Sequence, residues 1–168
     1  MTSSGYLLDT GVFVQAHRNY YGLDLCPGFW EALRHFQSEG RLRSLDRVRD
    51  EIREGDALAG WITEAPAGFF VSSAAPEVAA KYAELMAWAS AADFTDAAKA
   101  KIASGADGWL VAYAAVNDLV VVTHESHEPA RKNLVKIPNA CEQFNVEWAD
   151  TFWMLRELEV KFNWAVPR

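Results

Sequence analysis

The sequence predicts an α/β domain with a central, mainly parallel sheet of about four to five strands flanked by helices. Short apolar runs alternate with longer amphipathic segments along the chain. Proline, glycine and capping residues stand between these segments, and neither an internal repeat nor a long linker interrupts them. For 168 residues, these observations predict one domain over 1–168, large enough to bury a core.

The expected strands are short and apolar. They are expected at Gly5–Leu8, Leu42–Leu45, Leu119–Thr123, Leu134–Ile137 and Val146–Trp148. The segment GFFVSS is expected to be irregular and extended. Because open parallel sheets place their sites beyond the carboxyl ends of the strands, polar residues at those ends are the first candidates for function.

Capping residues and prolines give the boundaries of the expected helices. Gly40 is the stop signal of the helix that begins at Pro27. The helices are expected directly after Asp9, from Pro27 to Glu39, from Asp46 to Glu54, over Ala57–Glu64, Glu77–Ala91, Thr95–Ala103 and Asp107–Asn117, from Pro138, and from Asp150.

The composition limits the classes of function. Half of the residues (51%) are hydrophobic and seven are tryptophan, which favours a compact globule over disorder. The net charge is −7, so bulk electrostatics does not attract nucleic acid, and such a role needs local basic groups or bound cations. Cys26 and Cys141 lack CxxC spacing and are expected to be buried thiols. With neither a signal-peptide pattern nor a long apolar run, we expect a cytoplasmic protein without membrane contact.

Four acids stand at strand ends or helix starts. Asp9 follows an apolar strand, where it is either a helix N-cap or a site acid. Glu51 lies beside the buried stripe of its helix, at a position that a boundary glutamate or a site acid could occupy. Asp107 shares the apolar face of its helix, although Ser104-Gly-Ala-Asp107 also fits a capping box.

The fourth acid, Glu125, lies in the segment VVVTHESHE. His124 and His127 are three residues apart rather than four, they follow a strand, and no cysteine is near them in the sequence. A zinc box is therefore poorly supplied, and a strand end that presents Thr123 and Glu125 is the better interpretation. The phosphate-binding patterns GxGxxG and GxxxxGK[ST] are both absent, which argues against dinucleotide and P-loop enzymes.

These segments resemble the PIN-domain ribonucleases, which include the toxins of many bacterial toxin–antitoxin pairs. LLDTGVF, VRDEI, ADGWLVAYA and VVVTHE carry the resemblance in the family's order. More narrowly, YLLDTGVFVQA, PGFWEAL, KIPNACEQFNVE and FWMLRELEVKF are similar to a PIN-like family of unknown function. Two positions depart from the pattern: Gly11 stands where Ser or Asn is common, and Glu125 stands where Asp is commoner.

The resemblance implies a site that hydrolyses RNA with Mg²⁺ or Mn²⁺, which activates water and neutralises developing charge. Asp9 and Asp107 would be the main metal ligands. Glu51 would bind metal or position water, and Glu125 would complete the shell. Thr123 would orient a neighbour or a phosphate.

Outside the acids, Arg18, Tyr20 and Tyr21 could hold phosphate and stack bases, although aromatic residues at a helix junction more often pack. The rings of Phe29, Trp30, Trp109 and Trp153 are expected in the core or an interface, and Arg131 and Lys132 are expected to be a solvated pair.

Three functions follow from these observations. The leading one is a metal-dependent endoribonuclease, expected to be a toxin restrained by an antitoxin protein encoded nearby, with a homodimer also compatible. The second is a PIN-fold module without catalysis that binds RNA or protein. The third is a zinc protein centred on His124 and His127.

Overall fold

The computed structural model describes residues 5–52 and 56–168, and these form one five-stranded, all-parallel sheet. The strand order is β3-β2-β1-β4-β5. The strands are β1 (Tyr6–Leu8), β2 (Leu42–Leu45), β3 (Phe70–Val71), β4 (Val120–Val122) and β5 (Trp148–Ala149). The predicted α/β class and the predicted strand number are confirmed.

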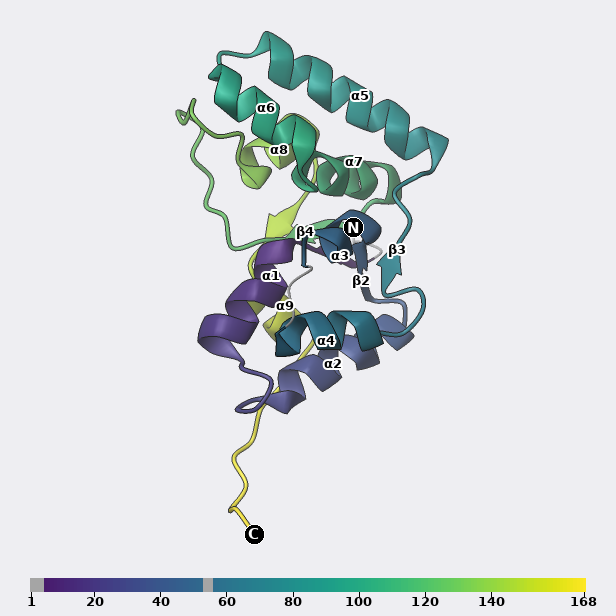
Figure 1. Ribbon diagram of the computed structural model, residues 1–168, viewed down its shortest axis with the longest axis vertical. Coiled ribbons are helices and arrows are strands. Elements are labelled where there is room, and N and C mark those ends of the chain that lie inside the picture. The colour runs from purple at the N-terminus through teal and green to yellow at the C-terminus, as the bar shows by residue number, and fades with distance from the viewer. Residues whose placement is uncertain (1–4, 53–55) are drawn as a thin grey trace.

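Helices cover both faces of the sheet. In Figure 1, α5, α6, α7 and α8 lie on one side of the sheet, while α2, α4 and α9 lie on the other. The helices of the described residues are α1 (Thr10–Gln15), the π-helical turn η1 (Ala16–Tyr20), α2 (Pro27–Ser38), α3 (Asp46–Glu51), α4 (Ala57–Glu64), α5 (Pro76–Ala91), α6 (Asp96–Ser104), α7 (Asp107–Asn117), α8 (Ile137–Gln143) and α9 (Thr151–Glu157). None of them is long and apolar enough to cross a bilayer.

The central strands are apolar on both faces because helices cover both sides of the sheet. Leu7 and Leu8 of β1 and Val121 and Val122 of β4 are completely buried. Such double burial explains why these strands consist of consecutive apolar residues instead of alternating apolar and polar ones. Because both faces of these strands are buried, the residues that directly follow β1 and β4 also have fixed positions.

The connections reverse direction between β1 and β4. The chain passes from β1 outward through β2 to β3, and then returns through α5, α6 and α7 to place β4 on the other side of β1. β1 and β4 pair in parallel with Leu8 opposite Val122, so both strands end at the same level. This is the switch point at which open α/β sheets bind ligands.

Two element predictions are corrected by the structure. Leu134–Ile137 is not a strand: its last residue begins α8, and β5 takes the edge of β4 instead. The apolar pattern arose because Val135 and Ile137 are buried in the core. Asp46 is the first residue of α3 and not its cap, and its Oδ1 accepts from the backbone N–H groups of Arg47 and Ser73. α3 ends at Glu51, and the expected end at Glu54 lies outside the described residues.

The aromatic residues are distributed between core and surface. Phe29 and Trp30 are buried, as expected. Trp109 is partly buried and stacks on Tyr82 with 3.8 Å between ring centroids, whereas Trp153 is 45% exposed. Both cysteines are free thiols; Cys141 is buried and Cys26 is half-buried.

Candidate active site

Asp9 is a buried carboxylate at the carboxyl end of β1. Its backbone N–H donates to Val122 O at 3.0 Å, which continues the pairing of β1 with β4 by one residue. Asp9 occupies the N-cap position of α1, but its side chain makes no capping hydrogen bond. Its Oδ2 accepts instead from Thr123 Oγ1 at 3.0 Å. Asp9 therefore stands at the N-cap position without capping the helix through its side chain, and its role as a site acid stays a prediction.

Thr123 connects two of the acids. It follows β4 directly and is 1% exposed. Its hydroxyl donates to Asp9 and accepts from the backbone N–H of Glu125 at 3.1 Å, so both hydrogen-bonding functions of the side chain are in use. The expectation that Thr123 orients a neighbour is confirmed; contact with a phosphate stays a prediction.

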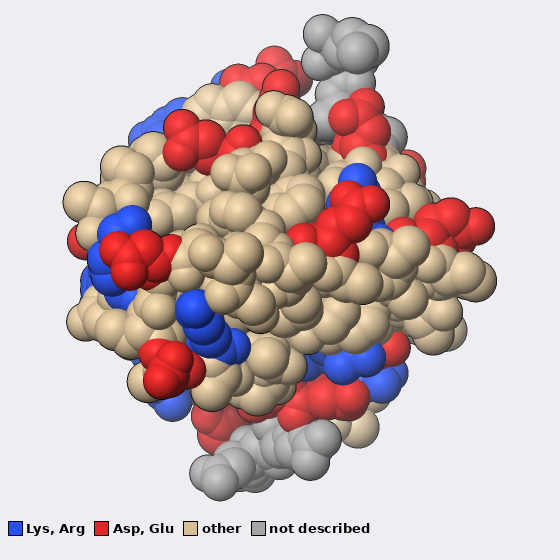
Figure 2. Space-filling view, turned by 90° about the horizontal axis from the view of Figure 1, so that it is seen from above, with Lys and Arg blue, Asp and Glu red and all other residues tan. Residues whose placement is uncertain are grey.

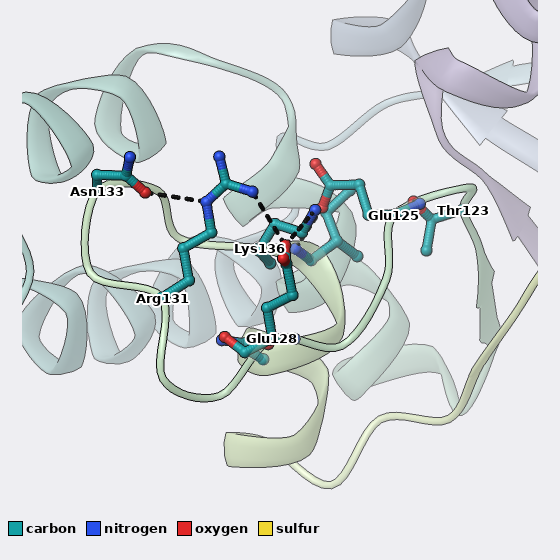
Figure 3. Close-up of polar contacts among 8 residues, drawn as sticks. Thr123, Glu125, Glu128, Arg131, Asn133 and Lys136 are labelled. Atoms are coloured by element: carbon teal, nitrogen blue, oxygen red, sulfur yellow. Dashed lines mark hydrogen bonds and ion pairs between the residues drawn. The ribbon is translucent and has the colours of Figure 1, made fainter.

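Glu125 lies on the loop between β4 and α8, and its Oε2 accepts from the backbone N–H of Ile137 at 2.6 Å. The rest of the loop is also fixed to its own residues. Glu128 Oε2 receives Arg131 and Lys136, each at 3.0 Å, as Figure 3 shows. Arg131 is thus paired within the loop, and its side chain stays 39% exposed to solvent.

A second clamp holds the same loop. The side-chain amide of Asn139 in α8 donates to Glu128 O at 2.7 Å, and its oxygen accepts from Glu128 N at 3.1 Å. Lys132 points elsewhere, with its ammonium 5.9 Å from the ring centroid of Phe94. These contacts tie the loop to α8 at Glu125 and at Glu128.

Glu51 connects the start of α1, which precedes it in the chain, with the start of α7, which follows it. Its Oε2 accepts from Thr10 Oγ1 at 2.6 Å and its Oε1 accepts from Ala106 N at 2.9 Å. The residue is solvent-exposed, yet both carboxylate oxygens are directed at the neighbours of Asp9 and Asp107. These two contacts fix the Glu51 carboxylate between α1 and α7, and its role as a site acid stays a prediction.

Asp107 begins α7 and is half-buried. The capping box predicted as its alternative is wrong: the N-cap of α7 is Ala106 without a side-chain cap, and Ser104 Oγ donates to Lys101 O at the end of α6. The Asp107 carboxylate accepts no hydrogen bond from any residue within 5–52 or 56–168. It is therefore the acid least engaged by the described protein.

A cation–π contact fixes α3 against α7. The Arg47 guanidinium lies 3.9 Å from the ring centroid of Trp109, and its Nε donates to Ser73 Oγ at 2.9 Å. Arg47 stands one helical turn before Glu51, and Trp109 stands two residues after Asp107. The contact thus sets the relative position of the two helices that carry these acids.

The neighbouring acids raise the pKa values of the two aspartates. Burial, followed by the charges of Asp107 and Glu125, raises the pKa of Asp9 to about 8. Burial, followed by the charges of Glu125 and Glu51, raises the pKa of Asp107 to about 7. The side chains therefore lie within electrostatic reach of one another, although their residues are up to 116 positions apart in the chain (125 − 9). A pocket with this surplus of negative charge takes up protons or a cation.

The donor set is compatible with Mg²⁺ or Mn²⁺, since carboxylate oxygens are the ligands that these hard cations prefer. Asp9 and Asp107 are the best-placed ligands, because Glu51 already uses both oxygens and Glu125 uses one. The side chains do not form a complete set of metal ligands, however. In the part of the chain that is described, no group of three or more His, Cys, Asp or Glu side chains converges closely enough to hold a metal.

The two histidines of the proposed zinc box point to different partners. His124 Nε2 lies 2.9 Å from Thr151 Oγ1, and burial lowers the pKa of this imidazole. His127 Nε2 lies 2.7 Å from Glu142 Oε2. The two imidazoles therefore face different partners and do not form a common metal site in this structure.

Two of the predicted substrate-binding residues, Arg18 and Tyr21, have different surroundings. Arg18 is exposed and lines a cavity of about 420 Å³ together with Thr10 and Glu51. Tyr21 is half-buried and stacks on Phe29 with 4.7 Å between ring centroids. Arg18 thus shares a cavity with Glu51, while the ring of Tyr21 packs against Phe29.

Sequence reasoning missed three groups that hold the acids: the Thr10 hydroxyl and the backbone N–H groups of Ala106 and Ile137. It also missed Lys101, whose charge lowers the pKa of Asp107 against the other influences. Only Thr10 gave a local signal, as the residue beside Asp9. The backbone donors carry no signal in their side chains.

A family model described as Domain of unknown function (DUF4411) matches residues 6–162. The chain belongs to this family. The DUF4411 match begins with β1, extends past α9 and contains all four acids. No curated protein gives a significant match to the chain.

Proposed function

We propose that this DUF4411 protein is a metal-dependent endoribonuclease with its active site at the ends of β1 and β4. The observation that carries the proposal is that Asp9, Glu51, Asp107 and Glu125, from four separate parts of the chain, lie close enough for their charges to raise the pKa values of Asp9 and Asp107. The carboxylates of Glu51 and Glu125 accept from backbone N–H groups, and the Thr123 hydroxyl links the Asp9 carboxylate to the backbone N–H of Glu125. The resemblance of the same segments to PIN-domain ribonucleases supports the same chemistry.

Each acid has a defined task in the proposed reaction. A bound Mg²⁺ or Mn²⁺ would supply an activated water and neutralise the charge that develops on the phosphate. Asp9 and Asp107 would hold the cation. Glu51 and Glu125, whose carboxylates are fixed by protein donors, would position water or complete the ligand shell.

The two departures from the PIN pattern fit this geometry. A Cβ on Gly11 would lie 3.4 Å from Asp9 Oδ2, an ordinary contact. Glycine therefore leaves open the space beside Asp9 that a Ser or Asn side chain fills in the pattern. Glu125 starts from a loop clamped by Asn139, and the longer side chain reaches the N–H of Ile137.

The surface charge agrees with a site that holds its substrate through a cation. Figure 2 shows the face above α5 and α6, where the acidic and basic side chains of the described residues are scattered and form no continuous basic surface. With a net charge of −7, affinity for a polyanion must come from the metal and from local groups such as Arg18.

The test is cleavage of a pool of single-stranded RNA by purified protein with Mg²⁺, with Mn²⁺, and with excess EDTA. We expect cleavage only with a divalent cation, and a loss of about 100-fold or more for Asp107→Asn. The matched control is Asp93→Asn, which neutralises an exposed acid. Equal cleavage in EDTA, or an active Asp107→Asn, would contradict the proposal.

A second candidate is a binding module without catalysis. Two observations favour it. Both carboxylate oxygens of Glu51 already accept hydrogen bonds from the protein, and the described residues contain no complete set of metal ligands. The two functions separate in the same assay, because the module would bind RNA or protein but cleave nothing in Mn²⁺.

We further propose that a protein encoded nearby restrains the nuclease, as in a toxin–antitoxin pair of the cytoplasm. An Arg or Lys of such a partner could enter the acidic pocket, pair with the carboxylates and displace the cation. The net charge would attract a basic segment to this protein. Growth arrest that requires Asp9 and is relieved by a neighbouring reading frame would support this partner. Harmless overexpression in the native host without the neighbours would refute it.

A further inference from the structure

An exposed aromatic ring lies beside the candidate active site. Tyr20 is the last residue of η1, and its side chain is 48% exposed. One face of the ring stacks on His124, with 5.7 Å between ring centroids and 29° between planes. Phe152 of α9 meets the ring edge-on at 5.1 Å. Although it contacts these two rings, Tyr20 keeps 48% of its surface exposed, so part of its ring is accessible to a ligand.

The ring of His124 is held firmly under Tyr20. Its Nε2 pairs with Thr151 Oγ1 at 2.9 Å, and Phe152 packs against it at 5.8 Å with 67° between planes. His124 stands between Thr123 and Glu125 in the chain, so its Cα lies ~3.8 Å from the Cα atoms of two site residues. The stacked pair therefore adjoins the site residues Thr123 and Glu125.

The next residue shows that this exposure is not a general property of the helix junction. Tyr21 is half-buried, with its ring stacked on Phe29 and a further contact to Phe162 at 5.4 Å. The apolar core thus takes the second tyrosine but leaves the first at the surface, on a support of other rings. A π-helical turn at this point is typical of functional sites.

The chemistry of an exposed aromatic ring suits an unpaired nucleobase. Stacking on a ring requires no positive charge, and every base offers a π-face. In a protein with a net charge of −7, affinity of this kind avoids the repulsion that weakens phosphate contacts.

We propose that Tyr20, supported by His124 and Phe152, is the stacking platform for one unpaired base of a single-stranded RNA that passes over the four acids. This inference rests on the proposed function and deepens it. Arg18 of the same helical turn lines the cavity with Glu51, whereas Tyr20 contacts residues that follow β4 and β5. The RNA would therefore cross the acids from the Arg18 cavity to the Tyr20 ring.

The test is a double-perturbation cycle, in which the Tyr20 ring is removed from the protein and the base is removed from the RNA, singly and together. A fluorescent single-stranded RNA and an RNA of equal length with abasic positions are titrated with protein in EDTA, where cleavage does not interfere. The variants are Tyr20→Ala, the conservative Tyr20→Phe, and Leu25→Ala, which removes another exposed apolar side chain (83% exposed). Cleavage of the same RNA in Mn²⁺ is measured in parallel, and thermal unfolding verifies that each variant is folded.

We expect Tyr20→Ala to weaken binding of the base-containing RNA by about 5- to 100-fold, the loss that one stacked base corresponds to. Tyr20→Phe and Leu25→Ala should bind like the wild type, and Tyr20→Ala should cause no further loss on the abasic RNA. In Mn²⁺ the KM should rise by a similar factor with kcat little changed.

The two proposals fail in different ways. Wild-type affinity in Tyr20→Ala, or equal losses on both RNAs, would overturn the platform and leave the exposed ring to a protein partner, while metal-dependent cleavage would still support the nuclease. Ring-dependent binding without any cleavage in Mn²⁺ would retain the platform and refute the nuclease.

Discussion

Replacing Asp107 by Asn should stabilise the metal-free protein at alkaline pH while abolishing activity. Burial and the neighbouring acids raise the pKa of this carboxyl from 3.8 to about 7. A carboxyl group whose pKa is raised on folding contributes most stability below its unfolded pKa, and that contribution is lost as pH rises through the folded value. Asparagine has nearly the same shape and carries no charge, so the variant escapes this loss.

The size of the effect follows from the pKa values. One pKa unit corresponds to ~1.4 kcal/mol, so a rise of about three units amounts to ~4 kcal/mol at pH 8. Relaxation of the pocket and shared protonation with Asp9 reduce this, and we expect a net gain of about 2 to 4 kcal/mol. The opposing loss of a carboxylate in the first turn of α7 is only ~0.3–1 kcal/mol, so the relief of repulsion should win.

Urea unfolding in EDTA at several pH values measures this prediction. The advantage of Asp107→Asn over the wild type should be small near pH 4, grow between pH 4 and about 7, and remain constant above. Asp93→Asn, at an exposed position, should show no comparable trend. Mn²⁺ should stabilise the wild type more than Asp107→Asn. A variant that is destabilised at pH 8 yet fully active would refute the assignment of Asp107 to the site.

Four further predictions follow from the same contacts. Wild-type protein without metal should lose stability in thermal scans between pH 4 and about 8, because the pKa of Asp9 is raised to about 8, and saturating Mn²⁺ should remove most of this loss. Thr123→Val removes the hydroxyl between Asp9 and Glu125, and should cost ~1–3 kcal/mol by urea unfolding as well as most of the cleavage activity. Asn139→Ala releases the loop of Glu125 and should weaken Mn²⁺ binding by ~10–100-fold in calorimetry, with Asn133→Ala as the control on the same loop. The double change His124→Ala and His127→Ala should leave the bound Mn²⁺ per protein unchanged, and loss of all metal would revive the zinc interpretation.

The sequence by itself determined the fold class and the identity of the candidate acids. Consecutive apolar residues such as those of β1 and β4 predict strands buried on both faces, and residues that follow such strands are expected at the carboxyl edge of the sheet. Asp9 and Thr123 were found in this way. Local patterns were enough here because each segment carries its own record of which faces must be buried.

Pairing choices and side-chain directions were decided only by the tertiary structure. The apolar run at Leu134–Ile137 predicts a strand, but β4 has one free edge and β5 occupies it. Whether Asp107 caps a helix or faces other acids depended on where Ser104 points, and that hydroxyl bonds to α6. The donors that hold Glu51 and Glu125 are a hydroxyl 41 positions away and two backbone N–H groups, and a backbone group leaves no trace in the sequence. Long-range contacts of this kind exist only after the chain has closed upon itself, so no local pattern can encode them.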